Sequence, residues 1–167
     1  MPSRVLIVAY GNPLRCDDGV AWRAADALEA KFPESEVEIL RLHQLAPEIA
    51  DTVRNRELVL FVDAACIDDI ENTHPGEIRV REVSGAENRE RPSHFSHVYS
   101  PDKVLGFARE LYQAAPKAFV ITVAGKDFSH GENLSAPVAT ALPELVTRIQ
   151  QLIEVVATKS ITTKDTK

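Results

Sequence analysis

The sequence is poor in the residues that cross-link a small protein or hold it in a membrane. It has only two cysteines, Cys16 and Cys66, and their 50-residue separation matches neither a zinc ribbon nor a CxxC motif. No apolar run approaches the roughly 18–20 residues that a membrane-spanning helix needs. The apolar segment after Arg4, VLIVAYG, is only seven residues long and lacks the features of a secretory signal peptide. We therefore expect a cytoplasmic protein with reduced cysteines and no membrane contact.

Basic residues are also outnumbered: the sequence has 25 acidic and 19 basic residues, which give a formal net charge of −6. This balance argues against a nucleic-acid partner, which usually requires a basic face. The 167 residues, 44% of them hydrophobic, suffice for one domain with a substantial core. We expect that domain to cover residues 1–157 and to be followed by a polar, disordered tail at 158–167, TKSITTKDTK.

Apolar patterning predicts alternating strands and helices. Five apolar or alternating segments predict strands at 4–10, 36–42, 57–63, 77–83 and 117–124, and four segments with helical spacing predict helices at about 18–32, 45–55, 101–115 and 137–157. Strict alternation in segment 77–83 predicts an edge strand with one solvated face. The whole pattern predicts an α/β fold in three layers, with a twisted, mostly parallel sheet of about five strands and helices on both faces, of a phosphorylase/hydrolase-like kind.

Acidic residues fall where such sheets bind ligands, beyond the carboxyl ends of the strands. Asp17 and Asp18 lie in the loop GNPLRCDDG after the first strand, and Asp63 closes the third. If these two strands are neighbours, Asp18 and Asp63 face one crevice, where a raised pKa or a bound cation relieves their repulsion. The alternative is structural: helix capping by Asp17 or Asp18, and a satisfied turn for Asp63.

Histidines supply a possible nitrogen ligand near the same edge. His94 and His97 lie in HFSH, just before the helix start Ser100-Pro101-Asp102. One imidazole with two carboxylates suits a metal such as nickel or zinc, although a lone histidine is more often a surface or capping residue. His43, after the second strand, is a weaker candidate.

Two other chemistries are less well supported. The loop GNPLRCDDG lacks GxGxxG and GKS/T, and its adjacent acids would repel a phosphate, which argues against nucleotide binding. Cys16 and Cys66 lie close in sequence to Asp18 and Asp63, but a small semi-buried side chain explains them more simply than a nucleophile does.

Four segments resemble the nickel–iron hydrogenase maturation proteases, peptidase family M52. GNPLRCDDGV is similar to the family's signature loop, VLFVDAA to its third strand, SHVYSPDKVLGFA to its histidine segment, and GENLSAPVATALPELVTRIQQL to its C-terminal passage. The likeness covers about residues 4–155. It implies that the family's metal-recognising residues fall on Asp18, Asp63 and His97, with His94 as the rival third position.

The resemblance implies an endopeptidase, of aspartic or metal-assisted type, that removes the C-terminal extension of a hydrogenase large-subunit precursor after nickel insertion. The nickel would be presented by the precursor, and no tightly held resident cofactor is expected. Two departures matter: Ala21 replaces a common glycine, and LHQLAPE replaces a Gly-Gly-Thr type of loop. The second leaves open which precursor is recognised and leaves a role for His43. The alternatives are a non-cleaving, metal-sensing docking protein and a metal-dependent small hydrolase on the same fold.

Overall fold

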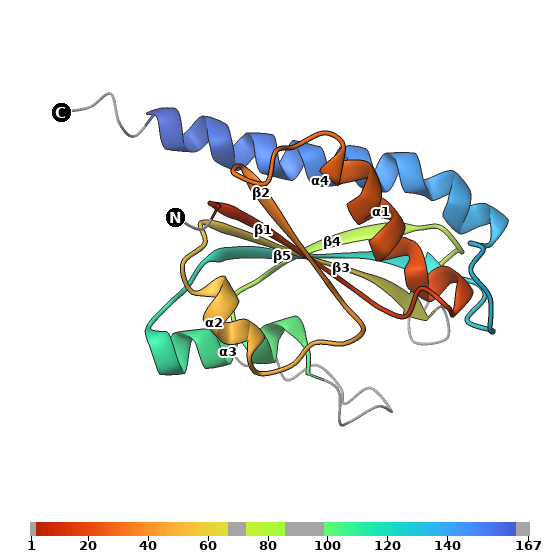
Figure 1. Cartoon of the computed structure of the whole chain (residues 1–167), viewed down its shortest axis with the longest axis horizontal. Helices are drawn as coiled ribbons and strands as arrows, with labels where there is room; N and C mark the ends of the chain where they lie inside the picture. The colour runs from red at the N-terminus through yellow and green to blue at the C-terminus, as the bar shows by residue number, and fades with distance from the viewer. Residues whose placement is uncertain (1–2, 67–72, 86–98, 163–167) are drawn as a thin grey trace.

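The computed structural model describes residues 3–66, 73–85 and 99–162 of the chain (Figure 1). In these segments one five-stranded sheet is formed by β1 (Val5–Tyr10), β2 (Val37–Leu42), β3 (Leu58–Cys66), β4 (Ile78–Val83) and β5 (Lys117–Gly125). The strand order is β2-β1-β3-β5-β4. Neighbouring strands are parallel except for β4, which runs antiparallel to β5 at one edge. The predicted mostly parallel sheet and its edge strand are confirmed.

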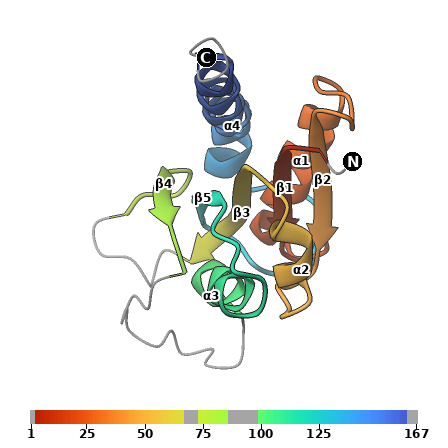
Figure 2. The ribbon, with the colours of Figure 1, turned by 90° about the vertical axis from the view of Figure 1, so that its left-hand side faces the viewer.

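Helices cover both faces of the sheet, so the three-layer prediction is also confirmed. On one face lie α1 (Val20–Glu29) and the long α4 (Ala136–Thr162). The other face carries α2 (Ile49–Val53) and α3 (Pro101–Tyr112), as Figures 1 and 2 show from two directions. Within the described part of the chain, no helix combines the length and the apolar character that a bilayer crossing demands.

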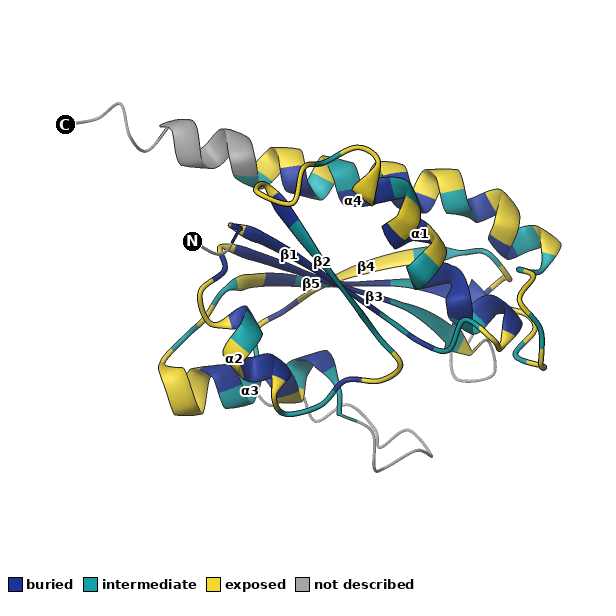
Figure 3. Ribbon diagram, viewed as in Figure 1, coloured by how far each residue is buried: buried dark blue, intermediate teal, exposed yellow. Residues whose placement is uncertain are grey.

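The core follows from the alternation of side chains along buried strands. In β1, Val5, Ile7 and Ala9 pack in the cluster beneath α1 and α4, whereas Leu6 and Val8 pack in the cluster beneath α2 and α3. Both faces of this central strand are therefore apolar, as expected of a parallel strand between two helical layers. Figure 3 shows the result: β1 and the first part of β3 are buried, β2 is mostly intermediate, and the edge strand β4 is largely exposed.

Several helix boundaries differ from the predictions, including the ends of α1 at Glu29 and α3 at Tyr112, and three of the differences have a local reason. Helix α2 begins only at Ile49, because Pro47 offers no N–H and disfavours a helical conformation at the residue before it. Helix α1 begins at Val20, after a 3₁₀ turn η1 (Cys16–Gly19) that contains Asp18. Helix α4 continues to Thr162 instead of ending near residue 157, because neither Gly nor Pro follows to stop it. The last part of the predicted tail, residues 163–167, lies outside the described residues.

The third strand does not close at Asp63, which corrects the prediction. It continues to Cys66 because β5 keeps pairing with it, up to Cys66 opposite Gly125. The neighbouring β1 pairs with β3 only as far as Ala9 opposite Val62. Asp63 therefore lies at the carboxyl end of β1 although its own strand runs on. The chain passes from β1 to β2 on one side of β1, and β3 then lies on the other side, so the strand order reverses between β1 and β3. In open α/β sheets, ligands bind at the carboxyl ends of the strands at such a reversal.

Candidate functional site

The loop after β1 has a backbone that only glycine permits at its first position. Gly11 has φ +135°, and a Cβ there would clash with the backbone carbonyl oxygen of Asp18. Its N–H donates to the carbonyl oxygen of Leu42 at 3.0 Å, which joins the loop to the end of β2. The N–H of Asn12 then donates to Asp18 Oδ2 at 2.8 Å. The Gly-Asn pair thus folds the loop back so that Asp18 returns to the end of β1.

Asp17 and Asp18 have different environments although they are adjacent. The Asp17 side chain has no exposed surface, and its carboxylate accepts hydrogen bonds from the N–H groups of Lys126, Asp127 and Ser135 and from the Ser135 hydroxyl. Asp18 is only partly buried, and the hydrogen bond from Asn12 satisfies one of its oxygens. Asp17 therefore has a structural role, but not the predicted one, because neither η1 nor α1 has a side-chain cap. Asp18 is the acid left available for chemistry.

Asp63 is the second carboxylate of the site, and the structure brings it close to Asp18. Burial, followed by the negative charge of Asp18, raises the pKa of Asp63 to about 8. The N–H of Ala64, which donates to Asp63 Oδ1 at 2.8 Å, and the hydroxyl of Tyr10 act in the opposite direction. The raised pKa is one of the two ways to relieve the repulsion that the sequence suggested, and it favours a protonated Asp63 at neutral pH.

Tyr10 is the site residue that sequence reasoning missed. It is the last residue of β1, and its hydroxyl hydrogen bonds to Asp63. Its own pKa is raised well above the usual value, first by burial and then by the charge of Asp63 and the hydrogen bond to it. The only signal in the sequence was a hydroxyl-bearing residue at the end of an otherwise apolar strand, directly before the Gly-Asn turn.

The charges of an ion pair also act on this tyrosine. Arg81 of β4 contacts Asp102, in the first turn of α3, with 3.2 Å between guanidinium nitrogen and carboxylate oxygen. Both charges act on the pKa of Tyr10: the arginine lowers it and the aspartate raises it.

The start of α3 has the predicted caps, since Ser100 accepts a hydrogen bond from the N–H of Lys103 and Pro101 is the first helical residue.

The structure does not test the predicted histidine ligands. His97 and its rival His94 lie outside the described residues, so their assignment stays a prediction. His43 is exposed after β2, where its ring lies 5.4 Å from the ring of Trp22. Trp22 in turn donates its indole N–H to the carbonyl oxygen of Leu42. Within residues 3–66, 73–85 and 99–156, no group of three His, Cys, Asp or Glu side chains is arranged to hold a metal ion.

The two cysteines differ in their exposure to solvent. Cys16 is buried in the loop with φ 46°, and its Sγ lies 3.9 Å from the Ser129 hydroxyl oxygen. Cys66 is exposed at the end of β3, and both thiols are free. The Cys16 thiol also hydrogen bonds to the carboxylate of Asp127. Its buried position in the turn fits the simpler interpretation of a small packed side chain.

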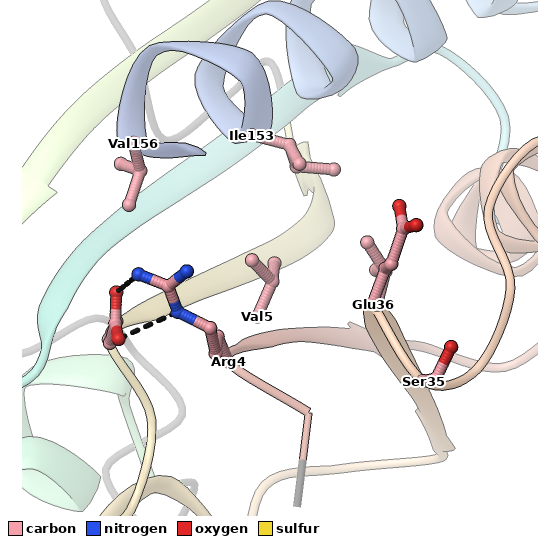
Figure 4. Close-up of a pocket in the computed structure, with 8 residues that line it drawn as sticks. Arg4, Val5, Ser35, Glu36, Ile153 and Val156 are labelled. Atoms are coloured by element: carbon pink, nitrogen blue, oxygen red, sulfur yellow. Dashed lines mark hydrogen bonds and ion pairs between the residues drawn. The ribbon is translucent and has the colours of Figure 1, made fainter. Parts of the chain in front are cut away.

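A pocket of about 230 Å³ lies at the opposite edge of the sheet, beside the amino ends of β1 and β2 and the later part of α4. Figure 4 shows Arg4 among the lining residues, and Arg4 forms an ion pair with Glu57. Its lining is Arg4, Val5, Ser35, Glu36, Val37, Glu57, Ile153 and Val156. Because these residues surround the amino ends of the strands, the pocket is separate from the carboxylates.

Comparison with known proteins identifies the fold. No family model matches the sequence, and no curated protein matches it either. Among solved structures, the chain is similar to the hydrogenase maturating endopeptidase HybD from E. coli, with 22% identity and a TM-score of 0.68 over 90% of this chain and 92% of that one. It is also similar to the hydrogenase maturation protease HycI from Thermococcus kodakarensis, with 20% identity and a TM-score of 0.67 over 91% and 93% of the two chains.

A third similar structure is the hydrogenase 2 maturation peptidase from Thaumarchaeota archaeon SCGC_AB-539-E09, with 19% identity and a TM-score of 0.65 over 90% of this chain and 98% of that one. Several solved hydrogenase maturation endopeptidases thus share the fold of this protein along most of both chains. The resemblance inferred from the sequence motifs is confirmed at the level of the fold.

Proposed function

We propose that this protein is a cytoplasmic endopeptidase that removes the C-terminal extension of a nickel–iron hydrogenase large-subunit precursor after nickel insertion. In this proposal Asp18, Asp63 and His97 recognise the nickel ion that the precursor carries. The ion belongs to the substrate, and the enzyme holds no metal of its own between reactions.

One observation carries the proposal: two carboxylates meet at the switch point of the sheet, and the charge of Asp18 raises the pKa of Asp63. At neutral pH the unfolded chain has this carboxyl group ionised, so protonating it on folding costs stability. Groups with strongly shifted pKa values concentrate at functional sites. A cation delivered between the two acids would relieve the repulsion. The fold, shared with hydrogenase maturation endopeptidases, supports the choice of substrate.

The same geometry supports a checkpoint on nickel insertion. A metal ligand must be deprotonated, so the arrival of a nickel-loaded precursor would displace the proton from Asp63 and complete the coordination with Asp18 and His97. A precursor without nickel would gain nothing from these side chains. A metal contact contributing roughly 4 kcal/mol would give about a thousandfold preference for the loaded precursor.

In the hydrolytic step, the substrate's metal would polarise the scissile carbonyl or lower the pKa of the attacking water. A site carboxylate would accept the proton of that water and return it to the departing amine. Asp18 suits the role of base, because the hydrogen bond from Asn12 occupies one carboxylate oxygen and the other remains available.

The test is cleavage of a cognate large-subunit precursor, loaded with nickel or free of it, by the wild type and by Asp18→Asn, Asp63→Asn and His97→Ala. We expect only the loaded precursor to be shortened, and each variant to lose at least a hundredfold in rate. Asp51→Asn is the matched control, because Asp51 is exposed on α2 and forms a surface ion pair with Arg54 at 2.9 Å.

Other outcomes assign other functions. If the wild type binds the loaded precursor without shortening it, the protein is a metal-sensing docking protein. If the purified protein carries about one metal ion per chain and cleaves small substrates, it is a metal-dependent hydrolase. Normal cleavage by Asp18→Asn or Asp63→Asn would show that the site lies elsewhere.

A further inference from the structure

We infer that Tyr10 is a positioning residue, whose hydroxyl holds the carboxyl group of Asp63 in the orientation that the cleavage reaction requires. The inference rests on the proposed function and adds a residue to its site. It follows from the register of two strands and from the contacts of one side chain.

The sheet places Tyr10 beside Asp63 on the same face. Val8 of β1 pairs with Phe61 of β3, and both side chains pack in the cluster beneath α2 and α3. Since side chains alternate along a strand, the residues two positions further on face the same side. Those residues are Tyr10 and Asp63, which are joined by the hydrogen bond described above.

Both the ring and the hydroxyl group of Tyr10 have fixed contacts. Its ring packs against the apolar cluster beneath α2 and α3, and its hydroxyl contacts Asp63. The Arg81–Asp102 ion pair of β4 and α3 acts on the hydroxyl through its charges. A phenol fixed in this way is a rigid donor, since the aromatic side chain has few rotatable bonds to order.

Asp63 needs such a donor to be oriented. One hydrogen bond, from the N–H of Ala64 to Oδ1, comes from the residue's own strand. Tyr10 supplies a second donor, from a different strand, so the carboxyl group is fixed at two points. A carboxylate has about four acceptor positions, which leaves capacity for the substrate's metal or for water. Removing a partner of this kind typically costs 10- to 100-fold in activity or metal affinity.

The experiment compares the wild type with Tyr10→Phe, which keeps the ring and removes only the hydroxyl. Tyr112→Phe is the matched control, because Tyr112 ends α3 and its ring contacts Arg54, away from Asp63. Steady-state cleavage of the nickel-loaded precursor gives kcat and KM separately, and thermal unfolding reports stability. We expect kcat of Tyr10→Phe to fall about 10-fold or more, with KM within about twofold and an unchanged melting temperature.

Each other outcome overturns the inference. Wild-type kcat in Tyr10→Phe shows that the hydroxyl does not position Asp63. A raised KM with unchanged kcat assigns Tyr10 to substrate binding. A parallel loss of kcat and melting temperature, absent in Tyr112→Phe, assigns it to stability alone. If the wild type itself leaves the precursor intact, the proposed function has failed and the role of Tyr10 fails with it, whereas in the first three outcomes the proposed function survives.

Discussion

Ser135 holds the buried carboxylate of Asp17 with two hydrogen bonds, one from its N–H at 2.7 Å and one from its hydroxyl at 2.8 Å. The N–H groups of Lys126 and Asp127 donate to the same carboxylate at 2.8 and 2.9 Å. These four bonds use about all the acceptor capacity of the group. Asp17 thus ties the loop after β1 to the segment between β5 and α4.

We predict that Asp17→Ala destabilises the protein by about 2–4 kcal/mol, because it leaves several buried donors without an acceptor. Urea unfolding measures the loss. Asp26→Ala is the control, since Asp26 is exposed in an ion pair with Arg41 and its removal should cost less than about 1 kcal/mol. Equal stability of the two variants would mean that the Asp17 network contributes little.

The sequence predicts the layers and most of the elements, because apolar periodicity reports directly which side of an element is buried. The boundaries it misses depend on other signals. Pro47 shortens α2, and the continued pairing with β5 carries β3 past Asp63. Neither effect can be calculated from the periodicity of the segment itself.

The site is predicted in part. The topological argument selects Asp18 and Asp63 correctly as neighbours, because it needs only the ends of two adjacent strands. It does not separate Asp17 from Asp18, since the distinction depends on a loop more than a hundred residues later in the chain. Tyr10 is missed because an aromatic residue at the end of an apolar strand is usually core. The role of His97 remains a prediction.

The fold of the loop after β1 gives a second prediction. We expect Gly11→Ala to displace Asp18 and to reduce precursor cleavage at least 10-fold, because the added methyl group would clash with the Asp18 carbonyl and the φ of +135° strains any other residue. Gly106→Ala is the matched control. Gly106 lies inside α3 with only an ordinary contact at 3.6 Å, so alanine there should stabilise the helix by about 1 kcal/mol and leave cleavage unchanged. Normal cleavage by Gly11→Ala would show that this turn does not set the position of Asp18.

The raised pKa of Asp63 makes stability depend on pH in a defined direction. The unfolded chain ionises this group near pH 3.8, whereas the folded protein holds its proton until about pH 8. Folding therefore favours the protonated form, and this contribution is complete below pH 3.8 and is lost as the pH rises to about 8. Asparagine cannot ionise, so Asp63→Asn should gain stability relative to the wild type across that window.

The gain should be on the order of 3 kcal/mol between pH 5 and pH 8, since each pH unit corresponds to at most about 1.4 kcal/mol. Urea unfolding of both proteins at several pH values measures it, and any loss of hydrogen bonding in the variant adds an offset that is the same at every pH. Above pH 8 the difference should level off. A difference that stays constant from pH 5 to pH 8 would mean that Asp63 ionises normally in the folded protein, and the argument that a cation is needed between Asp18 and Asp63 would lose its basis.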